Sequence, residues 1–286
     1  MPIGIAAHTM ATPGMTVEAA VELYRRLGFD AFDLVYQSGY GCGLSDETPE
    51  REVARLAGVV GDAGLVVSCL IPYVKAYNSL DERARKDALD AAKRSVDVAA
   101  ALAAPAIRIL AGEEVESDAA GRAWGAMVES LGRLADFAET RGIDLLLENH
   151  MENQVTSAAQ MVALVQALDH PRVGIIHDPA NLTIMGEPDD RSAFDLQQPH
   201  IRHVHLNDIH LVEEHPGYAA ALFDAGQAPW RRWVSWLVEA GYEGHMTIEY
   251  VYRWEPDALP APEEGLPGEL AAIRGAVRAA GGRLAR

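Results

Sequence analysis

The sequence has few cysteines and no long apolar run, which excludes several classes of protein. Its two cysteines, Cys42 and Cys69, form no CxxC pair. We therefore expect no disulfide framework and a reducing, cytoplasmic setting. The longest apolar stretches, such as residues 66–70 and 99–107, are much shorter than the roughly 20 residues of a bilayer span. Residues 1–14 contain no basic segment and no long apolar run, so we expect no signal peptide.

Positive charge is also scarce. The chain has 24 Lys and Arg against 42 Asp and Glu, which gives a formal net charge of −18. Such a charge repels phosphate backbones, so nucleic acid is not an expected partner. By contrast, 49% of the 286 residues are hydrophobic and 23% are charged. This mixture can build a full core and excludes disorder as the main state of the chain.

Short β-rich runs alternate with Ala-rich segments along the whole sequence. We predict strands at residues 4–7, 31–35, 66–70, 106–110, 143–148, 173–178, 203–206 and 246–250. We predict helices between them, for example at residues 16–27, 49–63, 81–103, 118–141, 156–168 and 230–240, with a final helical segment at 263–286. Gly28, Gly64, Gly142 and Gly241 follow helical segments and are typical helix stops before a new strand.

Two helix starts carry capping signals. Thr48 precedes Pro49, which places a hydroxyl before a proline at the first helical position. Ser79 and Glu82 have the spacing of a capping box, in which each side chain accepts a hydrogen bond from an unpaired backbone N–H of the first turn.

The repeated order of strand, helix and glycine gives eight strand–helix units. Runs such as LLLE and VGII are continuously apolar, as expected of parallel strands covered by helices. Eight such units predict an α/β fold, a single-domain (β/α)8 TIM barrel spanning residues 1–286. A doubly wound open sheet, the alternative, requires a Gly-rich first turn, and residues 8–14 contain no GxGxxG. The Pro- and Glu-rich residues 255–268 are interpreted as an excursion before the last helix.

The last four predicted strands end in LLLENH, GIIHDPAN, HVHLND and TIEY. Because the carboxyl ends of parallel barrel strands emerge on one face, Glu148, Asp178, His205 and Glu249 should meet in one cavity. Taken singly, each is an ordinary polar residue at a strand end. Taken together, three carboxylates and an imidazole repel and shift one another's pKa values unless a cation joins them. Mixed O and N donors suit Mn²⁺, Co²⁺, Mg²⁺ or Zn²⁺, so we predict one divalent metal ion.

Strand parity separates the histidines. His203 and His205 are two residues apart and should both point into the barrel, with His205 nearer the mouth as the ligand. His203 is then a residue of the barrel interior. His177 has the opposite parity to Asp178, so we expect it to face the helices in a structural role.

These strand ends resemble the sugar phosphate isomerase/epimerase superfamily, the xylose isomerase-like TIM barrels, which include ketose 3-epimerases, hydroxypyruvate isomerases and inosose dehydratases. As architecture the resemblance covers nearly the whole chain, and its motifs lie in the second half. It implies that Glu148, Asp178, His205 and Glu249 hold the metal. It also implies that Glu148 and Glu249 are the catalytic acid–base pair on either face of the substrate.

Two positions depart from the pattern of the ketose epimerases within that superfamily. Relatives often have a substrate-binding His where this chain has Asn181. The resemblance therefore makes Asn181 a substrate-binding candidate. Epimerases of the tagatose type commonly carry Arg where this chain has Leu211, so the contact of that Arg with the terminal hydroxyls of the substrate is not expected here.

Such a site can remove a proton from a carbon beside a carbonyl, because a metal on the carbonyl and hydroxyl oxygens stabilises the enediolate that forms. A carboxylate must take the proton, and Glu148 and Glu249 are the predicted pair. We therefore predict a metal-dependent isomerase or epimerase acting on a small sugar, ketose or polyol. Loss of a β-hydroxyl from the same enediolate would instead make it an inosose dehydratase-type lyase, and the sequence does not choose between them.

Other residues near the predicted mouth are candidates for binding substrate. His8 ends the first strand, and either binds a hydroxyl or is a plain loop residue. Arg108 lies within the fourth strand and is either paired with a carboxylate or bound to substrate. His150 shares the parity of Glu148. Asp208 either orients His205, binds substrate or belongs to a loop.

Two further functions remain as alternatives. An endonuclease IV-like nuclease would share the metal-lined barrel mouth, but it requires more metal-binding histidines and a basic DNA-facing surface. A sugar-binding barrel without turnover would keep the site and lack the chemistry. The expected partner is a small sugar or polyol, with no nucleic acid and no membrane, and the absence of an obvious basic phosphate cradle favours a non-phosphorylated one. The resemblance also implies a homodimer.

Overall fold

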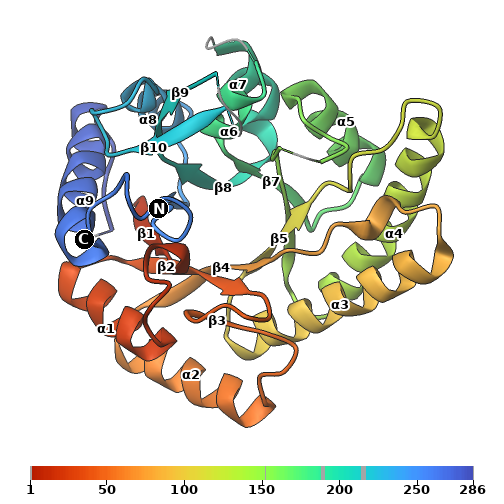
Figure 1. Ribbon diagram of the computed structural model, residues 1–286, viewed down its shortest axis with the longest axis horizontal. Coiled ribbons are helices and arrows are strands. Elements are labelled where there is room, and N and C mark those ends of the chain that lie inside the picture. The colour runs from red at the N-terminus through yellow and green to blue at the C-terminus, as the bar shows by residue number, and fades with distance from the viewer. Residues whose placement is uncertain (1, 152, 188–190, 214–216, 286) are drawn as a thin grey trace.

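The computed structural model describes residues 2–151, 153–187, 191–213 and 217–285, which form a closed barrel of eight parallel strands (Figure 1). The barrel strands are β1 (Gly4–His8), β2 (Ala31–Tyr36), β4 (Val66–Pro72), β5 (Ala106–Leu110), β6 (Asp144–Glu148), β7 (Val173–His177), β8 (Ile201–Leu206) and β11 (His245–Ile248). They follow one another around the barrel in chain order, and β11 pairs with β1 to close it. Each predicted strand corresponds to one of them, so the predicted single-domain TIM barrel is confirmed.

Helices cover the outside of the barrel (Figure 1). They are α1 (Val17–Leu27), α2 (Glu50–Asp62), α3 (Glu82–Ala101), α4 (Ala120–Glu139), α5 (Ala158–Leu168), α6 (Pro179–Ile184), α7 (Arg191–Gln197), α8 (Trp230–Glu239) and α9 (Pro262–Ala279), with 3-10 turns η1 (Thr9–Ala11), η2 (Ala76–Asn78) and η3 (Gln198–His200). The main core lies between strands and helices, for example around Leu147 of β6 and Leu131 of α4. Within the described ranges, no helix is long and apolar enough to cross a bilayer.

Glycines end the helices as predicted. Gly28 follows α1 with a φ of 90°, and its N–H donates back to carbonyls of the last turn. Gly142 and Gly241 have φ values of 71° and 72° before β6 and β11. Only glycine adopts this left-handed backbone without steric cost, so it can reverse the chain from helix to strand within two or three residues.

Both predicted helix caps are wrong. The Thr48 hydroxyl accepts from the N–H of Ser45, and α2 begins after Pro49 without a side-chain cap. The Ser79 hydroxyl accepts from the N–H of Asp81, and the Asp81 carboxylate caps α3 instead. Asp and Ser have similar preferences for this position, so the register of the preceding loop decides whether Ser79 or Asp81 caps α3.

Smaller elements surround the barrel. β3 (Gly43–Leu44) pairs with β2. β9 (Asp208–Leu211) and β10 (Tyr218–Ala221) form an antiparallel pair after β8, which the sequence did not predict. The predicted excursion at residues 255–268 is correct only in its first half, because α9 begins at Pro262 and contains Pro267.

The interior of the barrel is only partly apolar. One small cluster consists of Cys69, Ile71, Ala106, Leu146 and Ile176. Beside it the strands bury polar side chains, namely Asp33, Ser68, Arg108, His203 and Thr247. Buried polar groups persist only when they are paired, so the interior contains a polar network that leads to the strand ends.

Candidate metal centre

The structure brings together the four residues predicted as metal ligands. Glu148 is the last residue of β6, Asp178 follows β7, His205 lies in β8 and Glu249 follows β11. One ligand atom of each lies within 4.8 Å of the others, and all four residues are buried. They converge because parallel strands of a closed barrel release their carboxyl ends on one face.

His205 is at the centre of this group. Its Nδ1 lies 2.6 Å from Glu148 Oε1 and 3.2 Å from Glu249 Oε1. Despite that closeness, both Nδ1 and Glu148 Oε1 are buried without a hydrogen bond. Two electron-rich atoms left in this way are best joined by a positive ion, and an imidazole with three carboxylates is a donor set that Mg²⁺, Mn²⁺, Co²⁺ and Zn²⁺ accept. The residues therefore fit a divalent cation.

The local structure fixes Asp178. Its Oδ1 accepts from the N–H of Asn181 at 2.8 Å and caps α6, while its Oδ2 accepts from the Asn181 side-chain amide at 2.7 Å. The sequence Asp178-Pro179 starts this helix immediately after β7, because proline suits the first helical position. The carboxylate is thus held in place before any ligand binds.

Arg108 of β5 pairs with Glu148. Its Nη1 donates to Glu148 Oε2 at 2.9 Å, and its Nη2 donates to the Pro72 carbonyl at 3.2 Å. Burial raises the pKa of Glu148, but Arg108 and then His205 outweigh burial and hold it well below its usual range. Glu148 is therefore ionised, with Oε2 bound to Arg108 and Oε1 directed to His205.

The pKa values of Asp178, His205 and Glu249 are shifted by burial and by charges within the group. Burial, followed by the charges of Glu249 and Glu148, raises the pKa of Asp178 well above its usual value. Burial lowers the pKa of His205, but the same two glutamates outweigh it and raise that pKa. Burial opposes ionisation of Glu249, yet His205 lowers its pKa. The group thus retains protons that a cation would displace on binding, which is the usual coupling between metal binding and proton release.

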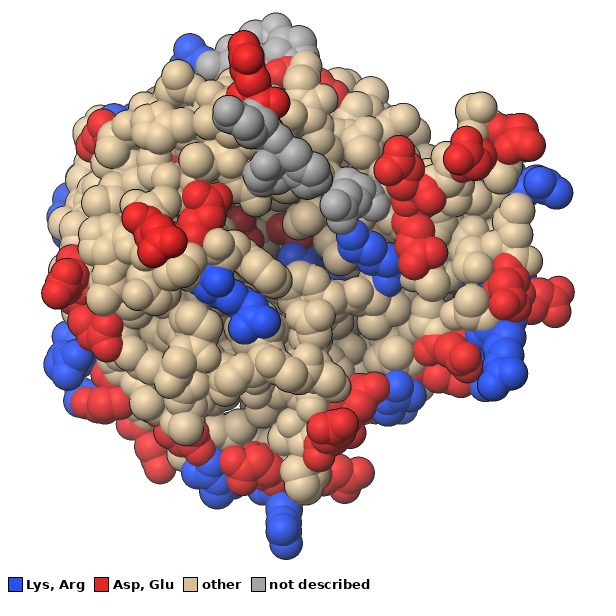
Figure 2. Space-filling view, viewed as in Figure 1, with Lys and Arg blue, Asp and Glu red and all other residues tan. Residues whose placement is uncertain are grey.

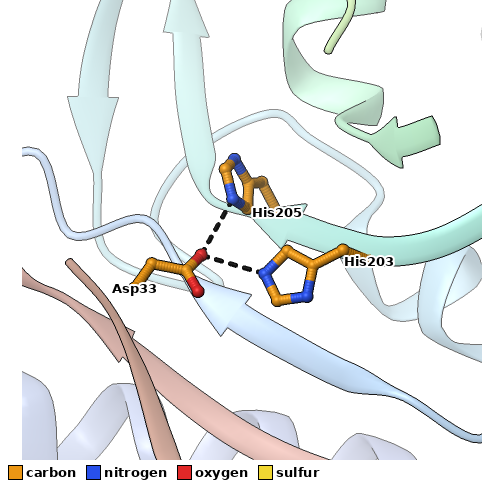
Figure 3. A group of neighbouring side chains, drawn as sticks. All are labelled: Asp33, His203 and His205. Atoms are coloured by element: carbon orange, nitrogen blue, oxygen red, sulfur yellow. Dashed lines mark hydrogen bonds and ion pairs between the residues drawn. The ribbon is translucent and has the colours of Figure 1, made fainter. Parts of the chain in front are cut away.

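A buried carboxylate that the sequence analysis missed lies behind His205. Asp33 of β2 accepts from Nε2 of His205 at 3.0 Å and from Nε2 of His203 at 2.9 Å (Figure 3). Its other oxygen accepts from the Ser68 hydroxyl at 2.7 Å. The signal in the sequence was an acidic residue inside the apolar strand AFDLVY. The parity prediction for His203 and His205 is confirmed, since both rings lie inside the barrel and bind Asp33.

A cavity of about 280 Å³ opens beside the four residues. Figure 2 shows a hollow near the middle of the molecule with acidic and basic side chains inside it. Glu249 lines the cavity and is 9% exposed, whereas Glu148 is fully buried. The polar lining of the cavity also includes Arg108, His150, Asn181, Asn207 and Tyr218. A larger cavity, of about 430 Å³, lies next to Arg202 and Tyr242, at the end of the barrel where the strands begin. It is therefore remote from the four residues at the strand ends.

Four of the predicted substrate-binding residues lie at or beside this cavity. Arg108, His150 and Asn181 line it. His8 is buried beside the cluster, with its ring centroid 6.0 Å from that of His205. Its Nδ1 accepts from the N–H of Met10 at 3.0 Å, so the proton of the neutral ring is on Nε2, which has no hydrogen bond. Burial lowers the pKa of His8 to about 4, which keeps the ring neutral.

The structure shows Asp208 in the third of its three predicted roles, as a residue that anchors a loop. Its carboxylate accepts from the backbone N–H groups of Ile209, Asp224, Gly226 and Ala228 at 2.8–3.1 Å. These bonds anchor the loop before α8, and the carboxylate that His205 Nε2 contacts is that of Asp33. A short-range pattern could not reveal this, because the loop that binds Asp208 is 16 to 20 residues further along the chain.

His177 faces the helices, as predicted. Its Nδ1 lies 2.7 Å from Oε1 of Gln197 in α7, and its ring packs on Phe194. Leu211, at the position where tagatose-type epimerases carry Arg, is 49% exposed. Neither side chain contributes to the cavity beside Glu249.

Comparison with known proteins agrees with this architecture. Residues 21–275 match the family model described as xylose isomerase-like TIM barrel. The chain is 29% identical over 193 residues to fructoselysine 3-epimerase of Shigella flexneri, a match that spans 63% of this chain and 66% of that protein, just under two thirds of its length. It is 27% identical over 88 residues to inosose dehydratase of Geobacillus thermodenitrificans (strain NG80-2), 31% of this chain and 29% of the dehydratase.

A solved structure has the same fold. It is that of a xylose isomerase-like TIM barrel protein from Mycobacterium smegmatis in complex with magnesium. The two chains superpose with a TM-score of 0.70 at 19% identity, over 96% of this chain and 97% of the other. At that identity the likeness concerns the fold.

Proposed function

The chain belongs to the xylose isomerase-like TIM barrel family, and from that premise we propose that it is a divalent-metal-dependent isomerase or epimerase. Its substrate would be a small sugar, ketose or polyol that reacts through an enediolate. The observation that carries the proposal is the buried group of Glu148, Asp178, His205 and Glu249, with two donor atoms that have no hydrogen bond, beside a polar cavity.

These four residues would hold the cation. When bound, a divalent ion at this position supplies a Lewis acid that stabilises negative charge developing on substrate oxygens. The remaining tasks, which are binding, orientation and proton transfer, belong to side chains of this chain.

Glu249 and Glu148 are suited to proton transfer. Glu249 borders the cavity and can take the proton from the carbon beside the substrate carbonyl. Glu148 lies across the site, because β7 and β8 separate β6 from β11. Its Oε1 is available while Arg108 holds Oε2. Epimerisation requires a second proton on the opposite face: Glu148 takes up a proton from solvent and donates it to the carbon, while Glu249 keeps the proton that it abstracted. Isomerisation requires Glu249 to return its proton to the neighbouring carbon, while the hydroxyl proton moves to the former carbonyl oxygen.

The cavity has the size and lining for a small polyhydroxylated molecule. Its volume of about 280 Å³ is near the lower end for ligand sites. The amides of Asn181 and Asn207 and the hydroxyl of Tyr218 line it and can donate or accept hydrogen bonds with sugar hydroxyls. His8, with its proton on Nε2, is a neutral donor beside the same site.

The match to inosose dehydratase supports a second candidate function, a dehydratase-type lyase. The first step is the same abstraction of a proton beside a carbonyl. The enediolate then expels its β-hydroxyl, which takes the abstracted proton from Glu249 and leaves as water, so the carbon itself is not reprotonated. Detection of a dehydrated product separates this reaction from epimerisation.

Solvent deuterium exchange tests the proposal. The protein is loaded in turn with Mg²⁺, Mn²⁺, Co²⁺ and Zn²⁺ and incubated in D₂O with a panel of ketoses and an inosose, and products are analysed by proton NMR. We expect metal-dependent replacement of one C–H by C–D in at least one sugar, with appearance of its epimer or isomer. Exchange with loss of water would favour the dehydratase. Metal binding without exchange of any sugar would contradict both the isomerase or epimerase and the dehydratase. The remaining function would be a barrel that binds a sugar without turnover.

A further inference from the structure

Asp33 connects two histidines in the interior of the barrel (Figure 3). We propose that Asp33 is a positioning residue that fixes the ring orientation and tautomer of His205 for cation binding, and that His203 holds Asp33 in place. The proposal rests on the metal site described above, but it concerns binding of the cation and not turnover of a sugar.

The tautomer follows from the hydrogen bond. An ionised carboxylate only accepts hydrogen bonds, and Asp33 Oδ2 lies 3.0 Å from His205 Nε2. The proton of the neutral ring must therefore be on Nε2, which leaves a lone pair on Nδ1. That lone pair faces Glu148 Oε1 and Glu249 Oε1, at 2.6 and 3.2 Å. Without Asp33 the proton is free to occupy Nδ1, and the ring is free to rotate away from the other ligands.

Asp33 is itself held by other strands. Ser68 of β4 donates to its Oδ1 at 2.7 Å, and His203 Nε2 lies 2.9 Å from its Oδ2. The hydroxyl of Thr247 in β11 lies 3.0 Å from the same His203 nitrogen. Asp33, Ser68 and His203 are at most 3% exposed. Side chains of β2, β4, β8 and β11 thus form one closed network, and the carboxylate cannot change rotamer without breaking bonds to two other strands.

The energetic cost of burying the Asp33 carboxylate supports a functional role for this residue. An apolar side chain would fill the centre of strand AFDLVY without the desolvation penalty that a buried carboxylate carries before it is paired. A carboxylate behind a metal-binding imidazole also raises the basicity of that ligand and fixes its orientation. Asp33 has this relation to His205, which is 172 residues away in the sequence.

A competing interpretation is that Asp33, His203 and His205 form a second cation site, because their ligand atoms lie within 4.8 Å of one another. Both histidine nitrogens, however, lie at hydrogen-bond distance from a single oxygen of Asp33. Hydrogen bonds already satisfy these atoms, whereas Nδ1 of His205 and Oε1 of Glu148 have no hydrogen bond. The geometry therefore favours one cation on the Nδ1 side.

The test measures metal binding alone. Wild-type protein and Asp33→Asn are titrated with Mn²⁺ and Co²⁺ by calorimetry, and metal content is determined by elemental analysis. We expect one equivalent in the wild type and an affinity lower by roughly 10- to 100-fold in the variant. His203→Gln keeps a hydrogen-bond donor toward Asp33 and should lose less of its affinity for the metal ion. Asp208→Asn, a buried Asp→Asn change on the same barrel that does not touch His205, is the matched control and should keep wild-type affinity.

A spectroscopic measurement separates positioning from general destabilisation. In ¹⁵N-histidine-labelled, Zn²⁺-loaded wild type, the His205 ring should carry its proton on Nε2. In Asp33→Asn the Nε2–H signal should shift, while circular dichroism shows a folded barrel. If Asp33→Asn does not fold, the same comparison is made with Ser68→Ala, for which we expect a smaller loss of affinity.

The remaining outcomes of these measurements would overturn the positioning role of Asp33, the proposed function or both. A folded Asp33→Asn with unchanged affinity and ring signals would overturn the positioning role. Two equivalents in the wild type, with one lost in Asp33→Asn, would show that Asp33 ligates a second cation. A wild type that binds no cation would overturn both this inference and the proposed function. Metal binding without sugar exchange would overturn the function alone.

Discussion

Arg108 of β5 and Glu148 of β6 form an ion pair with 2.9 Å between Nη1 and Oε2, and their side chains are 2% and 1% exposed. Arg108 also lies over the ring of Tyr73, with its guanidinium carbon 4.3 Å from the ring centroid. A buried pair of this kind stabilises a fold little compared with apolar residues, but removing one partner leaves an uncompensated charge.

Arg108→Met should therefore lower the free energy of unfolding by about 3 to 5 kcal/mol, measured by urea denaturation without metal. It should also raise the pKa of Glu148, because Arg108 is the largest influence opposing burial. The control is Arg141→Met, which breaks an exposed pair with Asp97 and should cost no more than about 1 kcal/mol. Equal effects of the two substitutions would contradict the importance of the buried pair.

Glu249→Gln and Glu148→Gln should each reduce solvent deuterium exchange into substrate by at least about 100-fold, the lower range for loss of a general acid or base. Because both residues are also proposed ligands, the variants are compared at equal bound metal, determined by elemental analysis. Tyr218→Phe removes a hydroxyl from the lining of the same cavity and should have a smaller effect. Near-normal exchange in either glutamine variant would exclude that residue from proton transfer.

Asp178→Asn should release the cation. The amide keeps an oxygen to accept from the N–H of Asn181, so α6 remains capped while the charge of the carboxylate is lost. Wild-type protein with metal at 100 times its Kd should gain about 2.7 kcal/mol of stability, seen as an increase in Tm, and the variant should gain much less. Asp144→Asn, which breaks partly exposed pairs at the other end of β6, is the control. Full metal retention in Asp178→Asn would remove Asp178 from the ligand set.

Asp208→Ala should destabilise the protein without reducing metal content. Four backbone N–H groups lose their acceptor, and an unsatisfied buried group costs about 1 to 3 kcal/mol. Water will satisfy part of the set, so we expect a loss of about 3 kcal/mol or more by denaturant unfolding. Loss of metal with unchanged stability would instead support one of the other roles considered for Asp208, which are orientation of His205 and binding of substrate.

Stability should depend on pH through Glu269 of α9. Both its carboxylate oxygens accept from the N–H of Phe223, at 3.1 and 3.2 Å. Burial raises its pKa from 4.5 to about 7. Between these values the folded protein holds a proton that the unfolded chain has lost, so this contribution to the free energy of unfolding falls as pH rises to 7 and is level above it.

Glu269→Gln should remove this contribution. Relative to the wild type, the variant should gain about 2 kcal/mol of stability between pH 5.5 and pH 8, measured by urea unfolding at both values. Glu264→Gln, an exposed change in the first turn of the same helix, should leave the difference from wild type unchanged with pH. Parallel pH profiles for wild type and Glu269→Gln would show that Glu269 is ionised throughout this range.

Local patterns in the sequence were sufficient for the barrel and for the four clustered residues. Runs of apolar residues, helical segments and stopping glycines such as Gly28 and Gly142 are decided by neighbours within a few positions. The closed parallel topology then places every strand end on one face. For that reason Glu148, Asp178, His205 and Glu249 could be brought together from the sequence without knowing a single distance.

Only the tertiary structure decided how those residues are supported. Asp33 meets His205 across the barrel, and Arg108 meets Glu148 between neighbouring strands 40 residues apart. Asp208 is bound by a loop that no periodic pattern describes. Which inward side chains touch depends on strand register and barrel closure. These are properties of the whole sheet, so no short stretch of sequence contains them.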